Sequence, residues 1–140
     1  MASVTFTIPG KPFGKQRARA GKGHSGRARV FTPEPTVSFE RQVGTIAGQH
    51  IRAPLHGPVL LTVEAFFAVP ASWSKAKQRA MLGQPHTQKP DTSNIVKAVE
   101  DGMNLIAYAD DAQIADQVAR KRWALVNETR VTLAPLGGPA

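Results

Sequence analysis

An apolar stretch at residues 59–69 constrains the fold of this 140-residue chain more than any other feature. It is rich in Val, Leu and Phe, is interrupted by Thr62 and Glu64, and follows the turn residues Gly57 and Pro58. β-branched and aromatic residues in a short run after a turn are typical of a strand. The run is far too short to cross a bilayer. We therefore expect a strand that is buried on at least one side, in a protein without a membrane segment.

Strand-like and helix-like patterns alternate on either side of this stretch. Further strands are expected at residues 3–8, 30–32, 113–123 and 128–133, the last two as a hairpin that turns near Asn127. Helices are expected at residues 35–49, 75–82 and 91–104. This order, without a repeat or linker, predicts one α+β domain over residues 1–140. We expect a two-layer sandwich in which helices cover one face of a mixed β-sheet.

Charge is distributed unevenly along the chain, whose net charge is +8. Residues 1–90 carry 13 Lys and Arg against three acids, whereas residues 91–140 carry five Lys and Arg against seven acids. The excess of Lys and Arg in residues 1–90 favours a polyanionic partner, because basic side chains that neutralise phosphates release the counterions bound to them. Six of the ten acids lie between Asp91 and Asp116. Acids clustered in this way would repel a phosphate, so the cluster indicates a cation that is held where the polyanion binds.

The absence of Cys excludes disulfides, cysteine nucleophiles and thiolate metal sites. The chain begins Met-Ala-Ser-Val-Thr, which lacks the basic and apolar layout of a signal peptide. We therefore expect a cytoplasmic protein.

A glycine-rich loop at residues 11–29 holds seven basic residues and no acid. Its composition predicts a flexible segment, which could be a disordered solubilising arm. Seven positive charges without an acid favour contact with DNA instead. Together with a basic residue just before the acidic window, the expected DNA-binding residues are Lys11, Lys15, Arg17, Arg19, Lys22, Arg27, Arg29 and Lys89.

The helix expected at residues 91–104 has two different faces. One stripe is apolar at three- and four-residue steps and is expected to pack on the core: Ile95, Ala98, Val99, Gly102, Met103 and Ile106. The other stripe is polar and spans about 80° of arc at 100° per residue: Asn94, Lys97, Asp101 and Asn104. Asp91 lies at the N-terminal end of the polar stripe, so two acids, an amide and a lysine are expected to point the same way.

Two further acids, Asp110 and Asp111, follow this helix at the start of the next expected strand. Mg²⁺ prefers hard oxygen ligands, usually one or two carboxylates with water and substrate phosphate oxygens. The bound metal acidifies a water and offsets charge on the phosphorus, and a nearby Lys stabilises the transition state or the leaving oxygen. The acids, amide and lysine of the polar stripe, together with Asp110 and Asp111, therefore suit hydrolysis of a phosphodiester.

These motifs resemble the pattern of RusA-type crossover-junction endodeoxyribonucleases. The stretches that carry the resemblance are Lys89-Pro90-Asp91, then Asn94 and Lys97, then Asp110-Asp111-Ala112-Gln113, with looser similarity in the N-terminal strand and the basic loop. The resemblance implies a RusA-like fold and a homodimeric, Mg²⁺-dependent enzyme. We expect that Mn²⁺, which tolerates looser geometry, can substitute for Mg²⁺. It implies symmetric cutting of four-way DNA junctions (Holliday junctions) in recombination and repair, often by proteins that phages encode. It also implies catalytic roles for Asp91, Lys97 and Asp111 and metal ligation by Asp91, Asp110, Asp111 and the position of Ser93.

Ser93 departs from the family pattern. The best-known relatives have a second acid there, in Asp-x-Asp-Asn, whereas this chain reads Asp91-Thr92-Ser93-Asn94. A hydroxyl is a weaker and neutral ligand, so the expected site loses one negative charge. Either Asp110 or Asp101 compensates, or metal affinity and activity are reduced. The second outcome keeps open the alternative of a non-catalytic or degenerate nucleic-acid-binding protein.

The residues of the expected site also have structural interpretations. Asp91 could cap the helix, and Asp110 and Asp111 could be turn residues. Lys97 could be a solvated surface residue, and we favour an ordinary i,i+4 ion pair with it as the role of Asp101.

Three rings outside these motifs also have more than one interpretation. His86 lies three residues before Lys89 and could approach the site as a base, although none of the four His has metal-ligand spacing. Trp73 and Trp123 are expected in the core or in a dimer interface, not as stacking partners of nucleic-acid bases.

Overall fold

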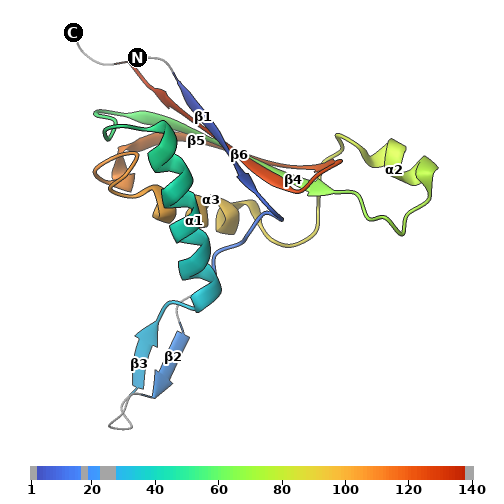
Figure 1. Cartoon of the computed structure of the whole chain (residues 1–140), viewed down its shortest axis with the longest axis horizontal. Coiled ribbons are helices and arrows are strands. Elements are labelled where there is room, and N and C mark those ends of the chain that lie inside the picture. Colours follow the sequence, from blue (N-terminus) through green and yellow to red (C-terminus); the bar gives the residue numbers. More distant parts are fainter. Residues whose placement is uncertain (1–2, 17–18, 23–27, 138–140) are drawn as a thin grey trace.

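The computed structural model describes residues 3–16, 19–22 and 28–137 of the chain. Its elements in chain order (Figure 1) are β1 (Val4–Pro9), β2 (Arg19–Lys22), β3 (Ala28–Phe31), α1 (Glu34–His50), β4 (Val59–Ala68), α2 (Lys75–Met81), α3 (Thr92–Met103), the 3₁₀ turn η1 (Asp111–Gln113), β5 (Ile114–Ala124) and β6 (Glu128–Pro135). Among these described residues, no helix has the length and apolar character that crossing a membrane requires.

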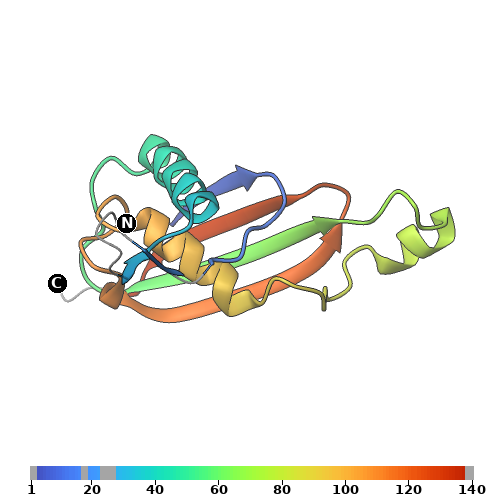
Figure 2. The same ribbon diagram turned by 90° about the horizontal axis from the view of Figure 1, so that it is seen from below.

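Four strands form a mixed sheet in the order β1-β6-β4-β5, with β4 and β5 parallel and the other neighbours antiparallel. Helices α1 and α3 lie on one face of this sheet, while α2 projects beyond the end of its strands (Figures 1 and 2). The structure thereby confirms the α+β class with helices on one sheet face.

The hairpin predicted for the last two strands is wrong, although both strands are present. β4 lies between β5 and β6 and pairs with each of them. Asn127 provides a physical reason, because its Oδ1 accepts a hydrogen bond of 2.8 Å from the backbone N–H of Ala68 at the end of β4. This bond lets the connection between β5 and β6 cross the end of β4 without leaving that N–H unpaired.

The loop predicted at residues 11–29 is in part a β-hairpin. β2 and β3 pair antiparallel, from Arg19 opposite Phe31 to Lys22 opposite Ala28, and the pair projects away from the start of α1 (Figure 1). The strand expected at residues 30–32 therefore begins earlier and finds its partner inside the basic segment. Arg17 and Arg27 lie outside the described residues.

Helix α3 packs on the core as its apolar stripe predicts. Its buried residues are Ile95, Val96, Ala98, Val99, Gly102 and Met103. Ile106, the last expected member, follows the helix and is half-buried. The other face of this core comes from alternate residues of β4, all of them buried: Val59, Leu61, Val63, Ala65 and Phe67.

The two tryptophans lie together at the edge of this core. Trp123 is 6% exposed, which confirms the core prediction for it. Trp73 packs against the core from the segment before α2, and the two ring centroids are 5.0 Å apart despite their separation in sequence.

Gly102 lets α1 and α3 approach closely. A Cβ at this position would lie 2.7 Å from the Cβ of Val43 and 2.9 Å from the backbone oxygen of Glu40. Only glycine fits such a contact without movement of a helix. The close approach places Glu40 of α1 beside Asp101, the residue before Gly102.

Candidate functional site

Asp91 occupies the N-cap position of α3, but its carboxylate accepts no capping hydrogen bond. It forms an ion pair of 3.3 Å with Lys89, and the side chains of Asp91 and Lys89 are 52% and 87% exposed. The carboxylate therefore remains accessible at the start of the helix, as a ligand for a cation must be.

The N-terminal basic segment lies against the same end of α3. A Cβ at Gly14 would lie 2.5 Å from the Cβ of Pro90, so the backbone of Gly14 packs directly against the ring of Pro90. The backbone N–H of Lys15 donates to the carbonyl of Asn94 at 2.9 Å. Two motifs that are about eighty residues apart in the sequence thus meet at the start of α3.

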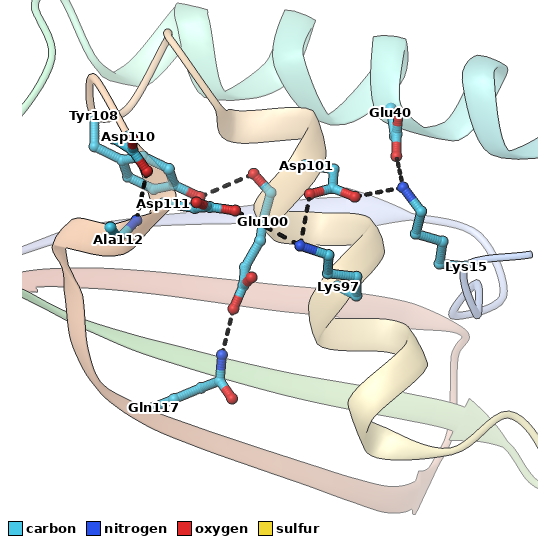
Figure 3. Close-up of polar contacts among 10 residues, drawn as sticks. All are labelled: Lys15, Glu40, Lys97, Glu100, Asp101, Tyr108, Asp110, Asp111, Ala112 and Gln117. Atoms are coloured by element: carbon cyan, nitrogen blue, oxygen red, sulfur yellow. Dashed lines mark hydrogen bonds and ion pairs between the residues drawn. The ribbon is translucent and has the colours of Figure 1, made fainter. Parts of the chain in front are cut away.

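Lys15 joins three parts of the chain through its ammonium group. Its Nζ donates to Glu40 of α1 at 3.1 Å and to Asp101 of α3 (Figure 3). Burial alone would lower the pKa of Lys15, but the hydrogen bonds to Asp101 and Glu40 outweigh it and raise that pKa. Lys15 is therefore held as a charged structural link, with its charge already matched by two acids.

Lys97 lies between two carboxylates on the exposed side of α3. Its Nζ is 3.3 Å from Asp101, the i,i+4 pair that the sequence indicates, and 3.6 Å from Asp111 (Figure 3). Burial lowers the pKa of Lys97, but Asp101, Asp111 and Glu100 outweigh this effect and raise it. The structure thus brings Lys97 and Asp111 together as a charged pair.

The loop that carries Asp111 is fixed by its neighbours. The Oδ1 of Asp110 accepts from the backbone N–H of Ala112 at 2.8 Å, and the Oε1 of Gln113 accepts from that of Asp110 at 3.2 Å. This capping box gives Asp110 the turn role considered from the sequence. The Nε2 of Gln113 also donates to the carbonyls of Leu55 and Gly57, at 2.9 and 3.1 Å. Gln113 thereby ties the loop to the segment before β4.

Glu100 also lies beside Lys97, Asp101 and Asp111, and it was not among the site residues predicted from the sequence. Burial raises the pKa of Glu100, Asp111 and Asp101 add to the rise, and Lys97 and a hydrogen bond from Gln117 oppose it. Its spacing of three residues from Lys97 was the available signal, because such residues are neighbours on a helix.

Tyr108, in the core, contacts the turn of α3 that carries Glu100. Its hydroxyl donates to the backbone oxygen of Glu100 at 2.9 Å, and its ring is fully buried. Burial, with Glu100, Asp111 and Asp101, raises the pKa of Tyr108, so the phenol stays neutral and keeps this hydrogen bond.

The candidate metal ligands do not form a closed cage. Within residues 3–16, 19–22 and 28–137, no three acidic or histidine side chains converge closely enough to hold a metal ion. Asp91 pairs with Lys89 at the helix start, Ser93 is exposed, and Asp111 pairs with Lys97 further along. Mg²⁺ usually takes one or two carboxylates with water and phosphate oxygens. The donor set fits such an open site, not an all-protein one.

The predicted basic residues differ in what the structure shows of them. Lys11 and Lys89 are exposed near the start of α3, whereas Lys15 is paired with acids. Only the backbone is described for Arg19 and Lys22 on β2 and for Arg29 on β3, and Arg17 and Arg27 lie outside the described residues.

A lysine among carboxylates, on a helix that packs on a mixed sheet and beside a basic segment, suits chemistry on phosphodiesters. The comparisons with known proteins identify the family. The sequence profile of Endodeoxyribonuclease RusA matches residues 9–134, and the chain belongs to this family of DNA hydrolases. The chain is also 34% identical over 122 residues to the uncharacterized protein YqaN of Bacillus subtilis (strain 168), covering 83% of this chain and 84% of that protein.

Proposed function

We propose that this protein is a Mg²⁺-dependent endonuclease that cuts four-way DNA junctions during recombination and repair. The observation that carries the proposal is the ion pair of 3.6 Å between Lys97 and Asp111. It joins the helix motif to the Asp-Asp-Ala-Gln motif, while the exposed carboxylate of Asp91 stands at the start of the same helix.

Asp91 and Asp111 are the carboxylates that would hold Mg²⁺, and Ser93 would offer a neutral hydroxyl. When bound, the ion would supply an acidified water and offset negative charge on the phosphate. Among the described residues, both acids considered as substitutes at the position of Ser93 already have other partners. Asp101 is held by Lys15 and Lys97, and Asp110 caps the η1 turn. We therefore propose that this site binds Mg²⁺ more weakly than one with a second acid.

Lys97 would act on the phosphate directly. The acids around it keep its Nζ protonated, and its side chain is 52% exposed, so it can donate to an oxygen of an arriving phosphodiester. A charge-assisted hydrogen bond of this kind is most valuable where negative charge builds up in the transition state.

The DNA would lie over the basic hairpin and the start of α3. Lys11 and Lys89 are exposed there, and the arginines of residues 17–29 continue the basic surface in sequence. Two opposed strands must be cut in a symmetric junction, and each chain carries one such site. We therefore propose a homodimer with two-fold symmetry.

A labelled synthetic four-way junction and a linear duplex of the same arm sequence test the proposal. Incubation with Mg²⁺, with Mn²⁺ and with EDTA separates metal dependence from substrate choice. We expect paired nicks in the junction with either metal, none in EDTA and little cutting of the duplex. Junction binding without cleavage in every metal would contradict the proposal and support the non-catalytic alternative, which the loss of an acid at Ser93 favours.

A further inference from the structure

A pocket of about 190 Å³ opens beside the start of α3 and shares Lys11 and Lys89 with the basic surface described above, while its other walls have no role assigned so far. It lies where the connection from α2 to α3 passes the ends of β4 and β5, a course that Figure 2 shows. Its walls include Phe67, His86 and Trp123, and its rim includes Lys11 and Lys89.

His86 is the most unusual side chain of this pocket. It is 5% exposed, and its ring stacks on Phe67 with centroids 3.7 Å apart and 4.5 Å from that of Trp123. Its backbone N–H donates to the carbonyl of Lys121, but its Nδ1 is buried and has no hydrogen-bond partner among the described residues. A buried polar atom without a partner is costly, which indicates that a bound group supplies one.

The imidazole of His86 is neutral at neutral pH. Burial lowers its pKa, and the positive charges of Lys121 and Lys11 lower it further. A neutral imidazole has one donor and one acceptor nitrogen, so it matches a ligand edge with groups of both kinds.

The rim of the pocket is basic and well fixed. The Nζ of Lys121 on β5 donates to the carbonyls of Gln88 and Pro90, at 2.6 and 2.9 Å. These bonds hold residues 88–90, which include Lys89, against β5. The acid beside the rim is Asp91, and Lys89 already pairs with it. Lys11 also lines this pocket and is exposed.

A nucleotide combines the features that this pocket requires. Its base presents an aromatic face and a mixed donor and acceptor edge, and its phosphate carries the negative charge that lysines bind. A phosphate alone would leave the ring wall unused. The volume is below the roughly 300–1,000 Å³ of pockets for drug-sized ligands, so it suits a single base.

We propose that this pocket binds one unpaired nucleotide of the DNA substrate, with its base at the wall of Phe67, His86 and Trp123 and its phosphate at Lys11 and Lys89. The choice of DNA as the source rests on the proposed function. Because Gln88 and Lys89 lead directly into Asp91, a nucleotide held here would fix the strand next to the proposed metal ligand.

The fluorescence of Trp123 provides a direct test. The chain has two Trp, so a Trp73→Phe variant leaves Trp123 as the sole reporter. It is titrated in EDTA with each deoxynucleoside 5′-monophosphate, with deoxyribose 5-phosphate and with inorganic phosphate. We expect a saturable change with the nucleotides and none with the two base-free probes. Calorimetric titration of the unaltered chain with the same probes repeats the comparison without any substitution.

Variants then locate the ligand within the pocket. His86→Phe keeps a ring on Phe67 and removes Nδ1, so nucleotide affinity should fall about three- to tenfold, the effect of one hydrogen bond. Lys11→Gln with Lys89→Gln should weaken nucleotides but not nucleosides. Lys75→Gln, an exposed lysine of α2, is the matched control and should change neither.

Two results would overturn the inference. Equal responses to inorganic phosphate and nucleotides would show a simple anion site, and no saturable response to any probe would show a pocket that holds water alone. Because no metal or cleavage enters the measurement, nucleotide binding can succeed where junction cutting fails, and the two proposals can be rejected separately.

Discussion

At the scale of single residues, Lys97 is the side chain that links the motifs of the site. Its ammonium group contacts Asp101 within α3 and Asp111 from the following loop, and it lowers the pKa of Glu100 against the effect of burial. Together with Lys15, which pairs with Asp101 and Glu40, two cations therefore face four acids: Glu40, Glu100, Asp101 and Asp111. Such an arrangement leaves an excess of negative charge that a bound metal ion would relieve.

The first prediction concerns Ser93. Ser93→Asp adds a carboxylate at the start of α3, where Asp91 is exposed, whereas Asp101 is already paired with two lysines and Asp110 caps the η1 turn. Junction cleavage should then saturate at a lower Mg²⁺ concentration, and the parent protein should gain more than the variant from Mn²⁺. The measurement is cleavage rate against metal concentration for both proteins. A curve for Ser93→Asp that is unchanged or shifted to higher Mg²⁺ would show that no ligand is missing.

The second prediction uses the raised pKa of Glu100. Because its pKa is above the ordinary 4.5 in the folded state, ionised Glu100 costs stability at neutral pH, and the cost disappears as the pH falls below about 4.5. Glu100→Gln should therefore raise the melting temperature at pH 7, with a gain that shrinks towards zero at pH 4. Thermal melts across this range measure the difference. The matched control is Glu34→Gln, an exposed acid of α1, and an equal gain there would contradict the assignment.

At the scale of elements, the contact between α1 and α3 positions the site. Gly102 brings the helices together, and the bridge from Lys15 to Glu40 and Asp101 spans the same contact. Packing and charge therefore fix the face of α3 that carries Lys97.

The third prediction tests this helix contact. In Gly102→Ala the new Cβ would meet Val43 and the backbone of Glu40, so the variant should lose about 1–3 kcal/mol of unfolding free energy. Gly48→Ala is the control, because its Cβ would meet nothing within 4 Å, and it should gain about 0.4–1 kcal/mol. Urea denaturation of both variants measures these changes. Equal stability of Gly102→Ala and the parent would refute the close approach.

Helices and strands were predictable from the sequence where a pattern among neighbouring residues determines them. The periodicity of residues 91–104 indicates both faces of α3, and the apolar run at residues 59–69 indicates β4. Strand pairing was not predictable, because the place of β4 between β5 and β6 depends on contacts between distant segments.

The same distinction applies to the site. The pair of Lys97 and Asp101 follows from helical spacing alone. The contact of Lys97 with Asp111, the link from Lys15 to Asp101 and the burial of Glu100 all require the folded chain. The sequence indicated Lys97 and Asp111 as parts of one expected site, but it did not indicate the link from Lys15 to Asp101 or the burial of Glu100.

At the scale of the whole molecule, charge is separated between a basic N-terminal segment and an acidic cluster that it partly covers. The segment at residues 11–16 lies on the start of α3, and the β2–β3 hairpin extends from it (Figure 1). A phosphodiester backbone that binds the basic segment would thus lie beside the acids. A cation bound among these acids would offset their repulsion of the phosphate.

The fourth prediction concerns the arginines of the basic segment at residues 11–29. Changing Arg17, Arg19, Arg27 and Arg29 to Ala should weaken junction binding and flatten its salt dependence, by up to about 0.9 in log–log slope for each phosphate that the variant no longer neutralises. Binding titrations at several salt concentrations give the slope. The control removes the charge of Lys75, on the distant α2. If the slope of the arginine variant equals that of the parent, the hairpin does not contact DNA.

The central claim is that Asp91 and Asp111 serve one metal-dependent cleavage site, and the fifth prediction tests it on the four-way junction with saturating Mg²⁺. Asp91→Asn, Asp111→Asn and the double variant should each cut more than about 100-fold slower than the parent, without additive losses, because the two carboxylates act as a unit. Junction affinity should persist or rise, since repulsion of phosphate is reduced. Asp116→Asn, an exposed acid of β5, is the control and should cut at the parental rate. A double variant that cleaves the junction with Mg²⁺ as fast as the parent would contradict the account.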